Sequence, residues 1–462
     1  MPYFFISAAH KSSGKTTISI GLTAAFQARG MSVQTFKKGP DYIDPMWLSA
    51  ASGRSCRNLD FFTMQREEIL QNFTHFMQDS DLGIIEGNKG LYDGLDLEGR
   101  NSNAALASML QAPVILVIDA RGMTRGIAPL ILGYQSFDPD IRIAGVILNK
   151  VGGSRHEEKL RQVIEHYTDV SVVGAVHYSS DLVIDERHLG LMPSNEAERT
   201  GEKIAIFGSS LASQVDLHRI LEIAGDTSLI LPGNKTLPDT AKKIGSDITI
   251  GYPQDRAFGF YYPGDLEKMA AAGARLVPFD CISDAHLPQV DALFIGGGFP
   301  ESSMELLEAN QSMRNEIRAF IENGGPAYAE CGGLMYLSRS LTWNGKTCKM
   351  AGVIPADAVM HSRPQGRGYV LLRETGESPW RLLPDQDRVI TAHEFHYSAL
   401  EGLPEGTRFA YDVLRGTGVD GSKDGIVYKN LLASYTHLRD VGGNQWTRRF
   451  LDHVERVQQG VR

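Results

Sequence analysis

The chain has 462 residues, about three times the length of a typical domain of ~150 residues, so we expect two or three domains, each with its own core. Hydrophobic residues make up 42% and charged residues 22%, and the 48 glycines and 20 prolines are scattered, which excludes a disordered, fibrous or low-complexity protein. Lys and Arg number 46 against 55 Asp and Glu, a net charge of -9, and no basic stripe is present. We therefore expect no nucleic-acid partner.

The four cysteines, Cys56, Cys281, Cys331 and Cys348, include no CxxC pair, which argues against a disulfide framework or a zinc knuckle. The first apolar stretch is too short for a signal peptide and lacks a cationic start and a cleavage site. No window approaches the ~20 apolar residues that a spanning helix needs. These observations predict a cytoplasmic protein with no membrane partner.

The first half of the chain alternates between short apolar runs and helical stretches. Helices are expected at residues 17–29 and 157–166, and the runs predict buried parallel strands at residues 3–7, 32–36, 82–86, 113–119 and 143–149. This alternation is typical of a doubly wound α/β sheet.

A predicted helix over residues 211–224 is followed by a segment rich in Gly, Pro, Asp, Thr and Lys, which indicates a domain boundary. We expect an ATP-binding domain over residues 1–225, a linker over 226–246 and a second domain over 247–462. The second domain continues the alternation, with strands expected at residues 248–251, 275–278, 292–295, 326–329, 369–372, 389–392 and 431–435.

A candidate phosphate loop follows the first strand. Residues 9–17, AHKSSGKTT, match GxxxxGK[ST] except that Ala9 stands at the first glycine. In such a loop, backbone N–H groups point at an anion, Lys15 reaches the β- and γ-phosphates of a nucleotide, and Thr16 binds Mg²⁺. The alternative is an ordinary strand-to-helix turn with an exposed lysine.

Carboxylates that could complete a magnesium site follow the next two strands, in FKKGPDYID (36–44) and EGNKGLYDG (86–94). Ligands of open α/β sheets bind at the carboxyl edge of the strands, and Mg²⁺ prefers oxygen ligands. Asp41 and Glu86 are therefore our metal candidates, although either carboxylate alone could simply cap a loop.

The second half contains a candidate nucleophile. Residues 327–337, AYAECGGLMYL, predict a buried strand, a sharp glycine turn and a helix, with Cys331 at the bend. A thiol at a helix N-terminus ionises more readily, and the thiolate is the attacking species. Cys281, in contrast, is expected to be a core cysteine.

A base and an oxyanion site are expected elsewhere in the same domain. His437 ends the late strand LLASYTH (431–437) and is our candidate base. Gly297 lies in the glycine loop IGGGFPE (295–301), whose free N–H groups, with that of Gly332, could stabilise a tetrahedral oxyanion.

Together, these motifs resemble the cobyrinic acid a,c-diamide synthase family of glutamine-dependent amidotransferases, which act on corrin-type tetrapyrroles. FKKGPDYID and EGNKGLYDG resemble the family's P-loop, dethiobiotin-synthetase-like ATP domain. DRAFGFYYPGDLEKM, GGGFPE, AECGGLMYL, HEFHYS and SYTHL resemble its class I, flavodoxin-like glutamine amidotransferase domain. The resemblance covers nearly the whole chain and implies ATP, Mg²⁺, L-glutamine, a tetrapyrrole substrate and a homodimer.

The resemblance also implies roles for single residues. Cys331 and His437 would hydrolyse glutamine. The metal ligands would be Thr16, Asp41 and Glu86. The remaining residues would bind the nucleotide (Gly14, Lys15, Thr16, Thr17, Lys37 and Asn149) or the tetrapyrrole (Tyr42, Ile43, Lys89 and Asp93).

The implied reaction amidates the a and c acetate carboxylates through an acyl phosphate and channelled ammonia. Asn88 and Lys89 stand where cobyrinate enzymes usually carry apolar residues, and this loop resembles that of enzymes acting on sirohydrochlorin or sirohaem; hydrogenobyrinic acid is a further alternative substrate. No acidic residue stands two positions after His437, so the third glutaminase residue is not assigned.

A P-loop ATPase that acts as a binding or regulatory module is the alternative of a different class. It would leave Cys331, His437 and the glycine loop without a role. Because a net charge of -9 gives no general attraction for a polycarboxylate macrocycle, we expect local attraction at Lys15, Lys37, Lys38 and Lys89.

Overall fold

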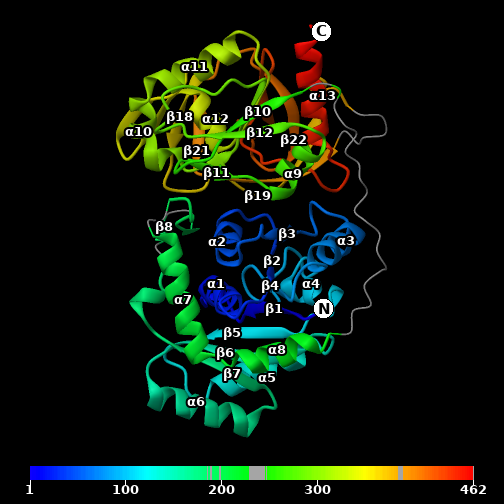
Figure 1. Ribbon diagram of the computed structural model, residues 1–462, viewed down its shortest axis with the longest axis vertical. Helices are drawn as coiled ribbons and strands as arrows, with labels where there is room; N and C mark the ends of the chain where they lie inside the picture. Colours follow the sequence, from blue (N-terminus) through cyan, green and yellow to red (C-terminus); the bar gives the residue numbers. More distant parts are fainter. Residues whose placement is uncertain are drawn as a thin grey trace. The chain divides into compact units, whose positions relative to one another are not determined.

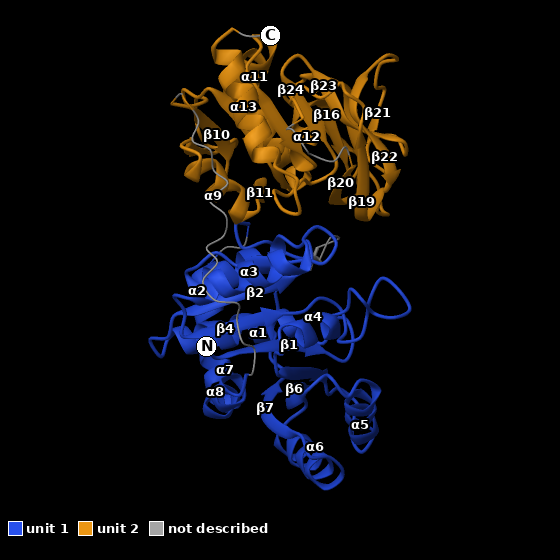
Figure 2. Cartoon of the chain, turned by 90° about the vertical axis from the view of Figure 1, so that its right-hand side faces the viewer, with its two compact units in different colours: residues 1–238 blue, residues 239–462 orange. Residues whose placement is uncertain are grey.

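The computed structural model describes residues 1–184, 186–187, 190–196, 199–227, 245, 247–382 and 389–460. The chain divides into two compact units, Met1–Pro238 and Asp239–Arg462 (Figure 2). The division falls inside the expected linker, residues 226–246, of which residues 228–244 and 246 lie outside the described part.

The first unit is built on a seven-stranded parallel sheet with strand order β3-β2-β4-β1-β5-β6-β7. Its strands are β1 (Tyr3–Ala8), β2 (Val33–Lys38), β3 (Arg57–Leu59), β4 (Leu82–Glu86), β5 (Val114–Asp119), β6 (Ile143–Val151) and β7 (Ser171–His177). A separate pair is formed by β8 (Glu186–Arg187) and β9 (Gly190–Leu191). The buried strands confirm the predicted doubly wound parallel sheet.

Helices cover both faces of this sheet. They are α1 (Lys15–Gln27), α2 (Ile43–Ser52), α3 (Arg66–Met77), α4 (Asn103–Met109), α5 (Ile127–Phe137), α6 (Ser154–Tyr167), the 3₁₀ turn η1 (Ser180–Leu182), α7 (Thr200–Gln214) and α8 (Leu217–Gly225). Phe4 and Ile6 of β1 belong to a core cluster with α1, α7 and α8. On the opposite face, the ring of Tyr3 lies 5.0 Å from that of Phe73 in α3. Figure 1 shows α1, α2 and α7 on one side of β1, β2 and β4, and α3 and α4 on the other.

The single helix expected over residues 211–224 is two helices. Val215 forms an antiparallel bridge with Gly174 of β7 and so leaves the helical path. Asp216 then caps α8 by accepting a hydrogen bond of 2.9 Å from the N–H of Arg219. The sequence pattern missed this break because the apolar residues continue across it.

The second unit has a nine-stranded mixed sheet with strand order β12-β10-β13-β15-β24-β23-β22-β19-β20. The parallel part comprises β10 (Thr249–Pro253), β12 (Arg275–Phe279), β13 (Ala292–Ile295), β15 (Ala327–Glu330) and β24 (Leu431–Ser434). The antiparallel part comprises β19 (Gly366–Glu374), β20 (Val389–His396), β22 (Arg408–Arg415) and β23 (Lys423–Tyr428). The strands expected at residues 369–372 and 389–392 therefore belong to an antiparallel extension of the sheet.

Two smaller sheets and six helical segments complete the described part of this unit. The small strands are β11 (Phe258–Phe260), β14 (Gly297–Gly298), β16 (Ser338–Trp343), β17 (Lys346–Lys349), β18 (Ile354–Met360) and β21 (Ser398–Glu401). The helices are α9 (Pro263–Ala271), η2 (Pro300–Ser303), α10 (Met304–Ala309), α11 (Gln311–Glu322), α12 (Gly332–Leu337) and α13 (Trp446–Gln458). One core cluster lies under α9 and α13, and another lies under α10, α11 and α12.

No helix in the described ranges is both long and apolar enough to cross a membrane.

Candidate active sites

The phosphate loop of the first unit has a glycine that its geometry requires. Gly14 has φ +90° and immediately precedes α1, which begins at Lys15. The side-chain amide of Asn149 donates a 2.8 Å hydrogen bond to the carbonyl of Ser13, and a Cβ on Gly14 would lie 2.1 Å from the same amide nitrogen. Asn149, near the end of β6, therefore holds the loop backbone, and its expected contact with the nucleotide stays a prediction.

Lys15 is a buried ammonium group that has no carboxylate within 4 Å among the described residues. Burial is the main cause that lowers its pKa to about 8, and the charge of Lys37 adds to this effect. Glu86, Asp44 and Asp93 oppose it from a greater distance. Because a buried cation is stabilised by an anion, this environment suits the phosphates that the loop motif predicts.

A compact group of oxygen atoms surrounds Thr16. Its hydroxyl donates to Glu86 Oε1 at 2.8 Å and lies 3.3 Å from Asp44 Oδ2. The Nζ atom of Lys37 lies 2.5 Å from Asp44 Oδ2, 2.9 Å from Glu86 Oε1 and 3.8 Å from Asp41 Oδ2. The structure thus brings Thr16, Glu86 and Lys37 together as expected, with Asp41 at the periphery of the group.

Asp44 is a member of this group that sequence analysis missed. It stands three residues after Asp41, in the first turn of α2, and its N–H donates to Asp41 Oδ1 at 3.2 Å. The spacing Asp-x-x-Asp at the start of a helix, which places both carboxylates on one side, was the available signal.

The charges of this group are strongly coupled. Burial raises the pKa of Asp41 to about 7, with the neighbouring Asp44 carboxylate adding to the shift, and burial also raises the pKa of Glu86. Burial alone would lower the pKa of Lys37, but Asp44, Glu86 and Asp41 outweigh it and raise that pKa. Lys37 is therefore the internal counter-ion of three carboxylates.

These oxygen atoms fit a magnesium ion that is bound together with nucleotide phosphates. Glu86 Oε2 is buried and has no hydrogen-bond partner within the described ranges. The same ranges contain no group of three His, Cys, Asp or Glu side chains that could hold a metal alone. Mg²⁺ is usually held by one or two carboxylates plus substrate phosphates, which this arrangement can provide.

The loop after β4 lies against the phosphate loop. The N–H of Leu91 donates to the carbonyl of Ala8 at 2.8 Å, and the amide of Asn103 donates to the carbonyl of Gly90 at 2.8 Å. Asp93 accepts a 2.9 Å hydrogen bond from the N–H of Gly90. Asn103, which sequence analysis missed, therefore shapes the loop that carries the predicted substrate residues.

The predicted substrate residues differ in exposure. Asp93 and Lys89 are exposed, and Lys89 has a positive φ of 36°. Tyr42 is buried and immediately precedes α2, whose first residue is Ile43. Their contacts with a tetrapyrrole stay predictions.

In the second unit, Cys331 occupies a strained bend between β15 and α12. Its backbone has φ +48° and ψ -100°, a region that residues with a side chain rarely adopt. Its N–H donates a 2.7 Å hydrogen bond to the carbonyl of Ser434, the last residue of β24. The bend has the strand–turn–helix geometry of the predicted elbow and lies at the carboxyl end of the sheet, and the role of Cys331 as nucleophile stays a prediction.

Glu330 is the acidic partner of His437 that the sequence did not reveal. Glu330 Oε2 lies 3.3 Å from His437 Nδ1, and both side chains are buried. Glu330 Oε1 accepts hydrogen bonds from the N–H of Leu438 at 2.9 Å and from the hydroxyl of Tyr328 at 2.5 Å. The acidic residue was expected after His437 in the sequence, whereas this carboxylate immediately precedes the candidate nucleophile.

The imidazole of His437 is held in a charged environment. Burial alone would lower the pKa of His437, but hydrogen bonds to Cys331 and Glu330 outweigh it and raise that pKa to about 10. The ring of His393 stacks on that of His437, with centroids 5.0 Å apart and planes 16° apart. Burial lowers the pKa of His393, and the charges of His437 and Arg439 add to the shift, so His393 is the neutral member of the pair.

The glycine loop lies directly against this group. A Cβ on Gly297 would lie 2.6 Å from His437 Cε1, and a Cβ on Gly332 would lie 2.9 Å from the nitrogen of Gly298. The loop and the elbow can approach each other only because both lack side chains. Their role as oxyanion donors stays a prediction.

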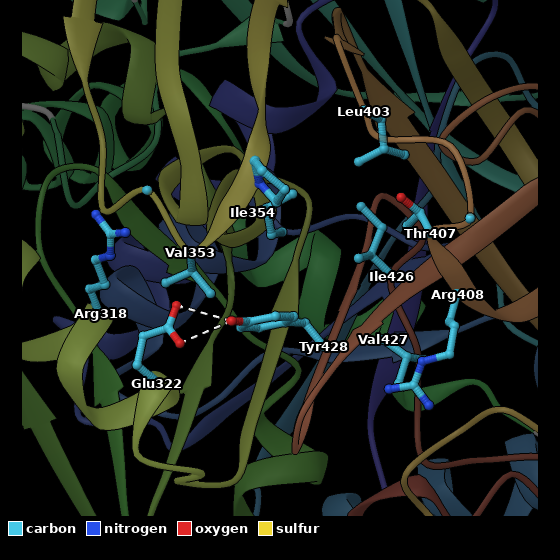
Figure 3. Close-up of a pocket in the computed structure, with 13 residues that line it drawn as sticks. Arg318, Glu322, Val353, Ile354, Leu403, Thr407, Arg408, Ile426, Val427 and Tyr428 are labelled. Atoms are coloured by element: carbon cyan, nitrogen blue, oxygen red, sulfur yellow. Dashed lines mark hydrogen bonds between the residues drawn. The ribbon is translucent and has the colours of Figure 1, made fainter.

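The second unit also contains a cavity of about 430 Å³ away from these residues (Figure 3). Val427 and Tyr428 line it and pair with Leu432 and Leu431 at the start of β24, whereas His437 follows the end of that strand. Figure 3 shows the carboxylate of Glu322 directed at the hydroxyl of Tyr428. The cavity therefore lies toward the opposite end of β24 from the candidate glutaminase residues.

Replacement of Gly14 tests the phosphate loop. In Gly14→Ala, the new methyl group would collide with the Asn149 amide, so we expect nucleotide affinity to fall at least about tenfold, measured by titration with a fluorescent ATP analogue. Gly30→Ala is the matched control: it has φ +81° but no atom within 4 Å of the added Cβ, so only backbone strain is introduced. Equal affinities for the two variants would contradict the proposed loop geometry.

Replacement of Glu330 tests the acidic partner. In Glu330→Gln, His437 loses a stabilising negative charge, so we expect the rate of glutamate release to fall about 10²-fold or more. The pKa of His437 should also fall, so the alkaline limb of the pH–rate profile should move to lower pH. Glu322→Gln, in the distant cavity, serves as the control and should change neither the rate of glutamate release nor its pH dependence. A wild-type pH profile for Glu330→Gln would show that this carboxylate does not act on His437.

Comparison with known proteins agrees with this division of the chain. The CobQ/CobB/MinD/ParA nucleotide binding domain family matches residues 5–191, and the CobB/CobQ-like glutamine amidotransferase domain family matches residues 249–441. The chain is 49% identical over 451 residues to the cobyrinate a,c-diamide synthase of Magnetococcus marinus, covering 96% of each chain. It is 41% identical over 466 residues to that of Methanosarcina acetivorans (96% of this chain and 93% of the relative) and 39% identical over 457 residues to that of Archaeoglobus fulgidus (98% and 97%). The chain therefore belongs to the cobyrinate a,c-diamide synthase family.

Proposed function

We propose that this chain is a ligase that uses ATP and glutamine to amidate the a and c acetate carboxylates of cobyrinic acid. The observation that carries the proposal is the similarity over almost the full length to cobyrinate a,c-diamide synthases, including 49% identity to one of them. The two groups of residues described above supply complementary halves of such a reaction.

Glutamine hydrolysis is assigned to the second unit. The thiolate of Cys331 attacks the carboxamide carbon of glutamine, and N–H groups at Gly297 and Gly332 stabilise the oxyanion. The intermediate then expels ammonia, whose nitrogen takes a proton from His437, and a thioester remains. Water cleaves the thioester to glutamate and restores the thiol, while Glu330 keeps the imidazole oriented.

Carboxylate activation is assigned to the first unit. A carboxylate at neutral pH is a poor electrophile, so its oxygen first attacks the γ-phosphorus of ATP, which releases ADP and forms an acyl phosphate. Channelled ammonia from the second unit then attacks the acyl carbon, and phosphate leaves to give the amide. Lys15 stabilises the negative charge of the phosphates, and Asn149 supports the phosphate loop. The hydroxyl of Thr17 donates to the carbonyl of Leu182 at 3.4 Å in the free protein, and its contact with the nucleotide stays a prediction.

Magnesium is part of this proposal. Thr16, Asp44 and Glu86, with Asp41 beside them, are the residues that would hold it together with the nucleotide. When bound, the ion neutralises phosphate charge. Lys37 occupies the centre of the same carboxylates, so it keeps them together when the nucleotide is absent.

Replacement of Cys331 separates the two half-reactions. Cys331→Ser should reduce glutamine-supported amidation at least about 10³-fold, because the serine hydroxyl is not activated as a thiolate is. Activity with ammonium salts should persist, as measured by product formation with each nitrogen source. Lys15→Ala is the reciprocal variant: it should stop amidation with either source and retain basal glutamate release. Loss of ammonium-supported activity in Cys331→Ser would contradict the two-site scheme.

Mass spectrometry identifies the substrate. The protein, MgATP and glutamine are incubated separately with cobyrinic acid, hydrogenobyrinic acid, sirohydrochlorin and sirohaem. We expect cobyrinic acid to gain two amides, because the relatives reported above carry the name cobyrinate a,c-diamide synthase. Amidation of sirohydrochlorin or sirohaem alone would assign the Asn88–Lys89 loop to a different substrate. Absence of both amidation and glutamate release would favour a P-loop binding module.

A further inference from the structure

Two consecutive lysines at the end of β2 have opposite environments. Lys37 has three carboxylates within 4 Å. Lys38 points to the other face of the sheet, as strand alternation requires, and its side chain is only 2% exposed. Its Nζ donates a 3.0 Å hydrogen bond to Asn101 Oδ1, and it has no carboxylate within 4 Å in the described part of the chain. Lys38 is therefore a buried cation whose contact is a neutral amide.

This environment is unfavourable for the protein alone. Burial is the main reason that the pKa of Lys38 falls to about 8; Asp60 opposes the shift, and the ammonium groups of Lys89 and Lys37 add to it. The Asp60 carboxylate also accepts hydrogen bonds from the hydroxyl of Thr63 at 2.9 Å and the N–H of Phe62 at 3.3 Å. A buried charge without a counter-charge is unfavourable for the free protein, and an anion that pairs with it removes this cost.

Lys15 shows which kind of ligand a buried ammonium group without an adjacent carboxylate indicates. It is also a buried ammonium without an adjacent carboxylate, its pKa is also lowered to about 8, and the loop motif identifies its anion as nucleotide phosphate. Lys15 follows β1 at the end of the phosphate loop, and Lys38 is the last residue of β2. Both strands pair with β4, so their carboxyl ends lie at one edge of the sheet. A second buried ammonium group at this edge therefore indicates a second anionic group in a ligand.

The loop that contacts Lys38 is suited to a molecule that is both anionic and apolar. Asn101 closes the segment from Asp93 to Asn101, in which Leu95 is half exposed and Leu97 is fully exposed. Lys89 lies at the start of the same loop and is exposed. A tetrapyrrole combines an apolar ring with carboxylates around its rim, so it can use the leucines and the lysines at once.

We propose that Lys38 is the counter-ion of a tetrapyrrole carboxylate, which replaces Asn101 Oδ1 as its partner, with Lys89 as the outer cation of the same subsite. The proposal rests on the proposed function for the class of ligand. It assigns Lys38 to substrate binding and not to the nucleotide.

Direct binding tests this subsite without turnover. Cobyrinic acid is titrated into the full chain and followed by its absorbance, and a fluorescent ATP analogue is titrated separately. Lys38→Met should weaken cobyrinic acid binding at least about tenfold and leave the affinity for the ATP analogue within about twofold. The melting temperature without ligand should stay equal or rise, because a buried unpaired charge is replaced by an apolar side chain of similar length. Lys159→Met, at an exposed lysine of α6, should change none of these values.

Asn101→Asp provides the second variant. An aspartate at this position supplies Lys38 with an internal carboxylate, so it should raise the melting temperature and weaken cobyrinic acid binding by competition. Weaker binding of the ATP analogue in Lys38→Met, with cobyrinic acid unaffected, would assign the anion to phosphate and overturn the proposal. A lower melting temperature with unchanged cobyrinic acid binding would make Lys38 a structural residue and would also overturn it. If wild-type protein binds cobyrinic acid without amidating it, the proposed function fails and the subsite remains testable by these titrations.

Discussion

Parallel strand pairing is the constraint on which both candidate sites depend. When neighbouring strands run in the same direction, the loops that leave their carboxyl ends meet at one edge of the sheet. In the first unit, this places the loops after β1, β2 and β4 together. In the second unit, it places the elbow after β15 beside the end of β24. Residues as far apart in the chain as Glu330 and His437 therefore come into contact.

The first unit concentrates charge at this edge in two different ways. The charge of Lys37 is compensated inside the protein by Asp41, Asp44 and Glu86, and the excess of carboxylates over ammonium in that group suits a cation. Lys15 and Lys38 are buried without such partners. Internal neutralisation gives stability, whereas an unpaired buried cation gives up stability in exchange for affinity toward an anion. The positions of these unpaired cations thus indicate where ligand charge is needed, although the chain as a whole is acidic.

Much of this architecture could be predicted because it rests on local sequence patterns. Apolar runs predicted the parallel strands, and glycine motifs predicted the phosphate loop and the cysteine elbow. Contacts between distant segments could not be predicted in the same way. Glu330 was missed because its relation to His437 depends on the pairing of β15 with β24. Asn103 was missed because its importance comes from a loop that folds back onto its amide. The break between α7 and α8 was missed because it is produced by a bridge from Val215 to β7.

The position of Glu330 directly before Cys331 determines how the candidate glutaminase residues are held in place. Glu330 is the last residue of β15, so one strand end fixes both the carboxylate and the sulfur. His437 is fixed by β24, and Asp424 supports the intervening bend by accepting hydrogen bonds from the N–H groups of Tyr435 and Thr436. Two paired strands therefore set the geometry of the three residues.

This arrangement also limits how protonation can control the site. The pKa of His437 is raised from 6.5 to about 10, so its contribution to stability is complete below 6.5 and is lost only as the pH rises through about 10. The imidazolium form is consequently retained at neutral pH, beside Glu330 and Cys331. The neutral His393, stacked on its face, adds no second positive charge to the pair. A change of pH within the neutral range therefore leaves the charge of His437 in the free protein unchanged, because its pKa lies well above that range.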